Sequence, residues 1–164
     1  MPEQGAKVKM LHLSDEITSG QTEMRRRASP AHRVFRASGL RAFEVNLLYT
    51  GDDSIAMMNQ MWRNKNAPTD VLSFCAWEGE MLVGAEDILG DIVISLETAE
   101  RQAHAYGHDL YSELAILTAH GLAHLLGMDH ERGLDDARIQ AECEMTWLST
   151  AGFNAMLALS GRAL

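Results

Sequence analysis

The chain has 164 residues, of which 46% are hydrophobic and 23% charged, and a formal net charge of −9. This length suits a single domain with its own core over 1–164, and the composition excludes disordered and fibrous proteins. Residues 1–41 carry eight Lys or Arg against four acids and residues 42–164 carry six against nineteen, so the acidic body argues against broad nonspecific nucleic-acid binding.

The N-terminal segment is weakly patterned over residues 1–28, and we expect it to be partly mobile, with a short strand around 8–13 at best. The three arginines at 25–27 could meet phosphates locally or simply form a solvated helix face. A serine and a proline at 29–30 are typical of an N-cap and a first helical position. They predict a short basic helix that begins there and stops at Gly39.

A strand followed by a helix is predicted next. FEVNLLYT (43–50) alternates apolar and polar side chains, as a half-buried strand does. In the helix predicted over 54–64, apolar side chains recur at threes and fours, and Asp52 and Asp53 are candidate caps at its start. That helix must end before Pro68, because proline cannot continue the hydrogen-bond ladder.

The rest of the chain predicts two strands and three helices. The strands are TDVLSFCAW (69–77) and DILGDIVISL (87–96), and the segment 78–86 between them is a loop or an edge hairpin. The helices follow the second strand, over 96–106, 110–126 and 134–149. Gly107 and Gly127 are the glycines expected to end the first two helices. The alternation of elements implies one sheet with helices packed on it.

Several features bear on the cellular compartment. Cys75 and Cys143 lack any metal-binding or redox spacing and are interpreted as reduced, buried small side chains. The opening MPEQGAKVKMLHLSDE has no apolar run of a secretory signal, and no stretch approaches the ~20 apolar residues that cross a bilayer. We expect a cytoplasmic protein with no membrane partner.

Residues 120–130 read HGLAHLLGMDH and place three of the seven histidines within eleven residues. Residues four apart on a helix lie on one face, so His120 and His124 can converge on one point. Beyond them, Gly127 can reverse the chain through a positive φ and bring His130 back toward the same point. The competing interpretation is that the first two are satisfied core or cleft histidines and the third is a surface residue.

Three neutral imidazoles with a fourth position open to water describe a catalytic zinc site rather than a structural one. Such an ion would lower the pKa of its water toward about 7, which favours hydrolysis. We therefore expect one Zn²⁺ per chain, held by His120, His124 and His130. The remaining histidines lack this context and are expected at the surface: His12, His32, His104 and His108.

The histidine spacing also resembles that of the metzincin zinc peptidases, whose HExxHxxGxxH shares all three histidines and the glycine. Their general base is the glutamate after the first histidine. Here that position is Gly121, which has no side chain to accept a proton. Peptide hydrolysis is therefore disfavoured.

A longer resemblance concerns three ordered motifs, NQMWRNKNAPTDVLSF (59–74), LGDIVIS (89–95) and HGLAHLLGMDH (120–130). Together they resemble the YbeY family of bacterial ribosomal RNA maturation factors. The resemblance covers about 43–147, and the first forty residues match poorly. It implies an α+β fold, with a mixed β-sheet packed with helices and a zincin-like metal site on a helix followed by a glycine turn.

The resemblance also implies a function. It is that of a zinc-dependent, single-strand-specific endoribonuclease acting in the cytoplasm on ribosomal RNA, notably at the small-subunit 3′ end, and in ribosome quality control. The implied partners are single-stranded rRNA and the ribosome or small-subunit assembly factors, with no DNA expected. By position, His120, His124 and His130 match the metal ligands of the family, and Arg63 matches its functional arginine.

Phosphodiester cleavage gives Arg63 an independent rationale, because a guanidinium can hold nonbridging oxygens bidentately as charge grows on them. Without the resemblance, an arginine that simply ends its helix facing water would be the preferred interpretation. Asp129 is a candidate to orient a ligand histidine, whereas Thr69, Asp70 and Ser73 are expected to shape the neighbouring strand. Attack by hydroxide or by the 2′-hydroxyl stays open.

Two alternatives belong to other classes. One is a metal-containing ribosome-assembly factor without turnover, whose zinc contributes only to folding. The other is a metallopeptidase-like or small-molecule hydrolase that takes its carboxylate base from elsewhere, such as Glu97 or Glu113.

Overall fold

The computed structural model describes residues 11–15, 21–40, 42–77, 87–129 and 133–158, and side chains only from residue 29 onward. Its strands are β1 (Leu11–Asp15), β2 (Glu44–Thr50), β3 (Val71–Cys75) and β4 (Ile88–Ser95). Its helices are α1 (Gln21–Ala37), α2 (Asp52–Arg63), α3 (Leu96–Tyr106), α4 (Leu110–Leu125), α5 (Leu134–Thr150) and a final 3-10 turn, Ala155–Ala158.

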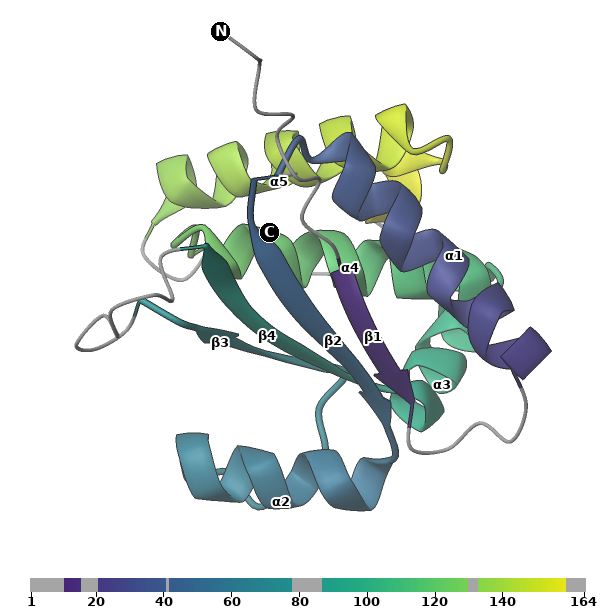
Figure 1. The fold of residues 1–164 in the computed structure, drawn as a ribbon, viewed down its shortest axis with the longest axis vertical. Coiled ribbons are helices and arrows are strands. Elements are labelled where there is room, and N and C mark those ends of the chain that lie inside the picture. Colours follow the sequence, from purple (N-terminus) through teal and green to yellow (C-terminus); the bar gives the residue numbers. More distant parts are fainter. Residues whose placement is uncertain (1–10, 16–20, 41, 78–86, 130–132, 159–164) are drawn as a thin grey trace, which may run out of the picture.

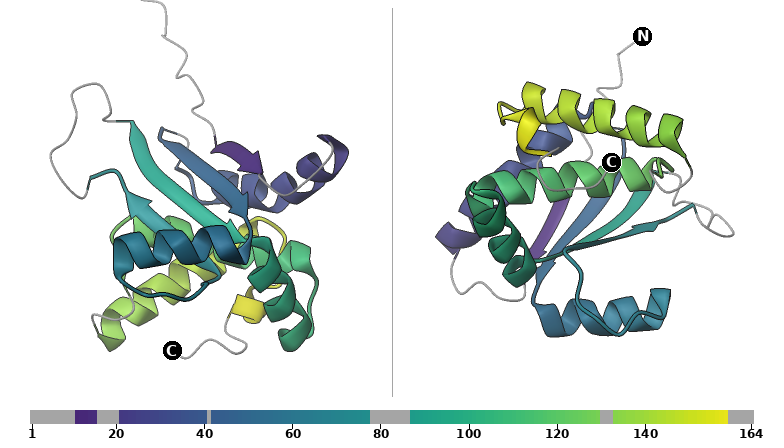
Figure 2. Two further views of the ribbon diagram at one scale, coloured as in Figure 1. Left: turned by 90° about the horizontal axis from the view of Figure 1, so that it is seen from below. Right: turned by 180° about the vertical axis from the view of Figure 1, so that it is seen from behind.

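The four strands form one sheet in the order β1-β2-β4-β3. β1, β2 and β4 are parallel, and β3 joins β4 in the antiparallel direction. Helices α1, α4 and α5 lie on one side of this sheet and α2 on the other, as Figures 1 and 2 show. The predicted α+β fold with a mixed sheet packed with helices is therefore confirmed.

The main core lies between the sheet and α4. Along β2, the side chains of Val45, Leu47 and Tyr49 alternate into it and are fully buried. Ile92 and Ile94 of β4 add to the same layer. Most of α4 is buried, as expected for a helix covered by the sheet on one side and by other helices elsewhere. α4 therefore packs across β3 and β4.

The opposite face of the sheet carries a smaller apolar cluster, in which Ile55 of α2 packs on Leu72 and Val93. Leu72 and Val93 are register partners across β3 and β4, and so they share one face. The neighbouring pair, Ser73 and Ile92, faces α4 instead. The strands thus separate α2 from α4, as the alternation of a pleated strand requires.

Two glycines allow β3 and α4 to pack closely against β4. At Gly90, where φ is +148°, an added Cβ would lie 2.2 Å from the carbonyl oxygen of Phe74. At Gly121, a Cβ would lie 2.9 Å from Cγ2 of Ile92, so α4 packs directly on the strand. Residue 121 faces the sheet, and a glutamate there would collide with β4. A glutamate that would serve as the peptidase general base therefore does not fit at position 121 of this fold.

The start of α1 was predicted wrongly. The helix runs from Gln21 to Ala37 with Pro30 in its interior, whereas the sequence predicts a start at 29–30. Proline removes one helical hydrogen bond but does not stop this helix, because Ala31 and Val34, which follow it, are fully buried. α1 packs on α4 and α5, and this burial outweighs the local cost of the proline.

Other boundaries agree closely with the sequence. β2, α3 and the end of α4 fall where they were predicted, and Gly107 is the left-handed C-cap of α3. The segment 78–86, predicted as a loop or hairpin, lies outside the described residues, as do residues 8–10 of the first predicted strand.

Cys75 and Cys143 are free thiols but half-buried, not buried as expected. None of the described helices is long and apolar enough to cross a membrane.

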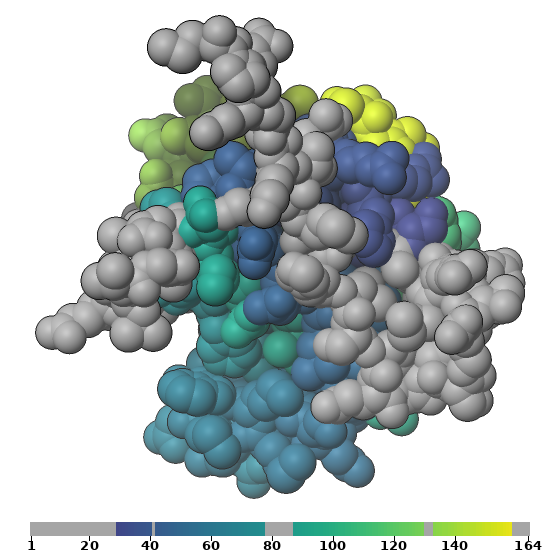
Figure 3. Space-filling view, in the orientation of Figure 1, coloured from purple at the N-terminus to yellow at the C-terminus, as the bar shows by residue number. Residues whose placement is uncertain are grey.

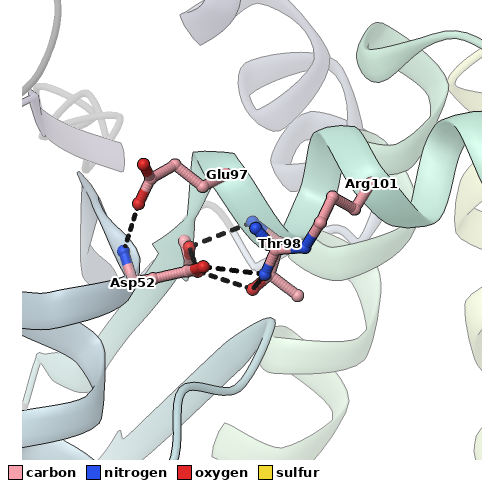
Figure 4. Close-up of polar contacts among 5 residues, drawn as sticks. Asp52, Glu97, Thr98 and Arg101 are labelled. Atoms are coloured by element: carbon pink, nitrogen blue, oxygen red, sulfur yellow. Dashed lines mark hydrogen bonds and ion pairs between the residues drawn. The ribbon is translucent and has the colours of Figure 1, made fainter.

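The predicted capping role of Asp52 was also wrong. Gly51 is the N-cap of α2 and offers no side-chain bond, while the Asp52 carboxylate reaches across to α3 (Figure 4). Oδ1 accepts hydrogen bonds from the hydroxyls of Ser95 and Thr98, each at 2.6 Å, and Oδ2 accepts one from Arg101 at 2.7 Å. This network fixes the start of α2 against α3.

The Asp52 network predicts a pH-dependent contribution to stability. Burial alone would raise the pKa of Asp52, but the hydrogen bonds from Ser95, Thr98 and Arg101 outweigh it and lower the pKa. A carboxylate whose pKa is lower in the folded state than in the unfolded state stabilises the fold at pH values above its unfolded-state pKa. This contribution is lost as the pH falls through the folded-state pKa. Asp52→Asn should therefore lower the unfolding free energy by about 1–3 kcal/mol at neutral pH.

The difference in unfolding free energy between the parent and Asp52→Asn should stay constant above about pH 5 and shrink below about pH 4. Urea unfolding at several pH values measures it. Asp53→Asn, at an exposed neighbouring position, is the matched control. A pH-independent difference would show that the carboxylate charge does not stabilise this junction.

Candidate active site on α4 and α5

His120 and His124 lie on successive turns of α4 and face the same way, as predicted. Their Nε2 atoms are 3.0 Å apart, and their ring centroids are separated by 4.6 Å. Both residues are half-buried, so solvent reaches them although most of α4 is covered. The geometry follows from the spacing of four residues, which repeats the same helix face.

A carboxylate from α5 fixes the first histidine. Nδ1 of His120 lies 2.9 Å from Oε1 of Glu144, and Nε2 of Gln140 donates to the same oxygen at 2.8 Å. Because a carboxylate only accepts hydrogen bonds, Nδ1 of His120 carries the proton in this contact. In the neutral ring, the lone pair is then on Nε2, which faces His124. Glu144 thus sets the tautomer and the orientation of His120.

The two nitrogens fit a shared metal ion. Two ligands that each lie about 2.05 Å from a tetrahedral zinc ion are roughly 3.3 Å apart, close to the Nε2 separation seen here. A carboxylate on the far nitrogen of a ligating histidine is the usual supporting contact of such ligands. Without metal, the same distance suits a hydrogen bond from Nε2–H of His124 to Nε2 of His120.

The third predicted ligand, His130, lies outside the described residues. Within the described part of the chain, no three His, Cys, Asp or Glu side chains are grouped to hold a metal ion. The turn that leads toward His130 is present: the amide of Gly127 bonds to the carbonyl of His124 at 2.9 Å, with φ at +80°. The ligand role of all three histidines therefore stays a prediction.

Arg63 is the exposed last residue of α2, the helix on the opposite face of the sheet from α4 and its histidines. The structure does not bring it into the histidine pair. The C-terminal ends of α2 and α4 nevertheless lie at the same side of the molecule, toward β3 (Figures 1 and 2). A substrate long enough to pass around the β3 edge could contact both.

The neighbouring strand residues have structural contacts. Asp70 accepts from the amide of Val71 at 2.7 Å and from the side chain of Gln102 at 3.0 Å, which ties β3 to α3. The hydroxyl of Ser73 donates to the carbonyl of Gly121 at 3.3 Å, which ties β3 to α4. Asp129, the last residue described before His130, is half-buried, and its orienting role stays a prediction.

The carboxylates considered for an alternative base are engaged elsewhere. Glu113 is buried, and its carboxylate lies 2.6 Å from Nε2 of His108, whose side chain is only 4% exposed; the expected surface position of His108 was therefore wrong. Glu97 accepts from the amide of Asp52 at 2.7 Å. His104 is exposed as expected. The side chains of Arg25, Arg26, Arg27 and His12 lie outside the described ones.

The sequence interpretation missed Glu144 and Gln140. Both are buried polar residues four positions apart on α5, where they face His120 across the contact between α4 and α5. Their spacing within a predicted helix was the available signal, because buried polar side chains almost always serve a partner. The partner itself could not be identified without the packing of α5.

A mixed sheet that supports two packed helices, with an imidazole pair on one and a buried carboxylate on the other, defines an α+β protein with a hydrolase-like centre. The model of the family described as "Endoribonuclease YbeY" matches residues 11–151. The chain therefore belongs to the YbeY family of endoribonucleases, which are RNA-cleaving enzymes. The match also includes β1 and α1, so it extends beyond the 43–147 expected from the motifs.

Individual relatives agree with this assignment. An "Endoribonuclease YbeY" of Pelotomaculum thermopropionicum is 48% identical over 117 residues, which cover 70% of this chain and 76% of that protein. The protein of the same name from Aquifex aeolicus is 44% identical, covering 73% and 77%. A solution structure from Thermotoga maritima shares the fold, with a TM-score of 0.58, 22% identity and coverage of 87% and 89%.

Proposed function

We propose that this protein is a zinc-dependent endoribonuclease that cleaves single-stranded ribosomal RNA in the cytoplasm, at the small-subunit 3′ end and in ribosome quality control. Its partners would be the ribosome or small-subunit assembly factors. Membership of the YbeY family supports the RNA-cleaving part. The observation that carries the metal part is the 3.0 Å approach of the two Nε2 atoms, with Glu144 holding the far nitrogen of His120.

In this proposal, His120, His124 and His130 hold one zinc ion, which would supply Lewis-acid activation of water and of the scissile phosphate. Glu144 accepts from Nδ1 of His120, so in the neutral ring Nε2 would be the nitrogen that holds the ion. Gln140 holds the Glu144 oxygen in place. Gly121 offers no carboxylate, so the proton acceptor of the peptidases is missing and their reaction is not expected.

Arg63 would act on the substrate rather than on the histidines. Its guanidinium is exposed at the end of α2, where it can hold nonbridging phosphate oxygens of RNA that passes around β3. The acidic body supplies few other cations, so RNA affinity should depend on few contacts and fall as salt rises. Attack by water and attack by the 2′-hydroxyl are both compatible with this arrangement.

Removing the metal should abolish cleavage without unfolding the chain. Purified protein should contain about one zinc per chain, and dialysis against a chelator should reduce cleavage of a single-stranded rRNA fragment about 1,000-fold or more, because the ion supplies several kcal/mol of transition-state stabilisation. Adding Zn²⁺ back should restore it. Elemental analysis, circular dichroism and gel-resolved cleavage are the measurements.

Different outcomes separate the competing functions. Protein that loses cleavage and also unfolds on chelation would point to a folding role for the ion. A zinc-loaded, folded protein that leaves every RNA intact would favour an assembly factor without turnover. Full cleavage after complete zinc removal would contradict the proposed mechanism.

Glu144→Ala should weaken zinc binding about 10- to 100-fold, because His120 loses the partner that fixes its ring and tautomer. Competition with a metal chelator measures the affinity. Glu142→Ala, an exposed carboxylate two residues earlier on α5, is the control and should leave it unchanged. Equal zinc affinity in Glu144→Ala and the parent would show that Glu144 does not orient a ligand.

A further inference from the structure

A groove lies on the α2 side of the sheet, away from the histidine pair. It has a volume of about 550 Å³, within the range of about 300–1,000 Å³ of small-molecule sites. Figure 3 shows the surface hollowed above α2. The side chains that matter come from four elements: Asn46, Met58, Trp62, Phe74, Asp91 and Val93.

One wall of the groove is aromatic and solvent-accessible. Trp62 is 66% exposed, an unusual state for so large an apolar side chain. Its ring meets Phe74 edge to face, with centroids 6.0 Å apart and an interplanar angle of 66°. This contact holds the indole in place while leaving much of its surface uncovered. Such a surface is what an unpaired nucleobase stacks on.

The polar side chains of the groove carry acceptors. Nδ2 of Asn46 donates to Oδ1 of Asp91 at 2.7 Å, and both residues are exposed. The contact uses one amide hydrogen of Asn46 and one lone pair of Oδ1, so the side-chain oxygen of Asn46, the second lone pair of Oδ1 and Oδ2 of Asp91 can still accept hydrogen bonds. A carboxylate here repels phosphate, so it favours the donor-rich edge of a base over the RNA backbone.

Cations lie close in sequence to the aromatic wall. Arg63 follows Trp62 directly as the last residue of α2, and Lys65 lies two residues beyond the helix; both are exposed. This arrangement separates a cationic position for phosphate from an acceptor position for a base. A single-stranded nucleotide has the same separation of charge and base.

We propose that the groove between α2 and the sheet is a nucleobase subsite for the RNA substrate, with Trp62 stacking on the base and Asn46 and Asp91 accepting from its edge. Guanine is the preferred base, because its adjacent N1–H and N2–H donors match a carboxylate, whereas uracil offers a single N–H donor there. The inference rests on the proposed ribonuclease function. It adds a preference for guanine at a nucleotide on the 5′ or the 3′ side of the cleaved bond.

The first experiment uses nucleotides that contain no phosphodiester bond, so its result is independent of cleavage. Guanosine 5′-monophosphate is titrated into the 15N-labelled full chain, and the indole N–H signals are followed by NMR. The Trp62 signal, assigned by its loss in Trp62→Phe, should shift saturably. Uridine 5′-monophosphate should shift it with at least about fivefold weaker affinity.

The second experiment measures the affinity of the full chain for guanine-containing and oligouridine single strands. Trp62→Ala should weaken binding of the guanine-containing strand about 5- to 100-fold, the range expected for loss of one stacked base. Trp62→Phe should retain most of the affinity. Asp91→Asn should reduce the preference for guanine over uracil. Met61→Ala, exposed on the same helix but not lining the groove, is the matched control.

The outcomes are separable from those of the metal experiments. A Trp62 signal that neither nucleotide moves, together with unchanged RNA affinity of Trp62→Ala, would overturn the subsite. Equal affinity for guanine and uracil would overturn the role of Asn46 and Asp91. Concentration-dependent dimers lost in Trp62→Ala would assign the groove to a second copy of the chain instead. A chain that binds guanosine monophosphate at Trp62 but cleaves no RNA would leave the subsite standing and contradict the nuclease mechanism.

Discussion

The double variant His120→Ala/His124→Ala is expected to lose RNA cleavage by about 1,000-fold or more. The two imidazoles approach to 3.0 Å at Nε2, and removing both leaves no ligand pair on α4 for the proposed ion. Loss of several kcal/mol of transition-state stabilisation corresponds to this factor at 1.36 kcal/mol per tenfold. The measurement is the initial rate on a single-stranded rRNA fragment, with zinc content determined in parallel.

His104→Ala is the matched control, since His104 is an exposed histidine on α3. The double variant should remain folded, because Gln140 still donates to Glu144 at 2.8 Å after His120 is removed. Circular dichroism and urea unfolding verify this, and the single variant His124→Ala avoids the Glu144 contact altogether. Parent-like cleavage by a folded double variant would remove the histidine pair from the mechanism.

Gly90→Ala should have the largest effect on stability, with a loss of about 3–5 kcal/mol. A Cβ at this position would lie 2.2 Å from the Phe74 carbonyl oxygen and 2.8 Å from Cδ2 of Leu125, and φ is +148°. Overpacking costs about 1–3 kcal/mol and the backbone strain of a non-glycine residue about as much again. A typical domain has only about 5–15 kcal/mol in total, so the variant should be close to unfolding.

Urea unfolding of Gly90→Ala beside Gly107→Ala separates the two causes. Gly107 also has a positive φ, of +74°, but nothing lies within 4 Å of its added Cβ. Its substitution should therefore cost only about 1–2 kcal/mol from backbone strain. If both variants lost the same free energy of unfolding, the close contact between β3 and β4 at Phe74 would not contribute to the effect of Gly90→Ala.

Much of the fold was predictable because its signals are local. The alternation of FEVNLLYT and the spacing of Gly107 after the third predicted helix depend on neighbours within a few residues. The start of α1 was not predictable in this way. Pro30 is a strong local signal for a helix start, and only burial of the following turns against α4 and α5 overrides it.

Some features of the candidate site could likewise be predicted from local sequence, and others depend on tertiary packing. The pairing of His120 with His124 follows from helix periodicity, and the motifs of the sequence indicated the family that the match over 11–151 shows. The attachment of His120 to Glu144 spans 24 residues and depends on how α5 crosses α4. The position of Arg63 across the sheet depends on which face α2 covers.

The sequence by itself determined the order of strands and helices, the shared face of the two histidines, the turn at Gly127 and the missing base at Gly121. The tertiary structure alone decided that Glu144 orients His120, that Asp52 ties α2 to α3, that Gly121 packs on Ile92 and that Trp62 borders a groove. Periodicity fixes which side chains share one element. Contacts between elements depend on packing angles and register, which many distant residues set together.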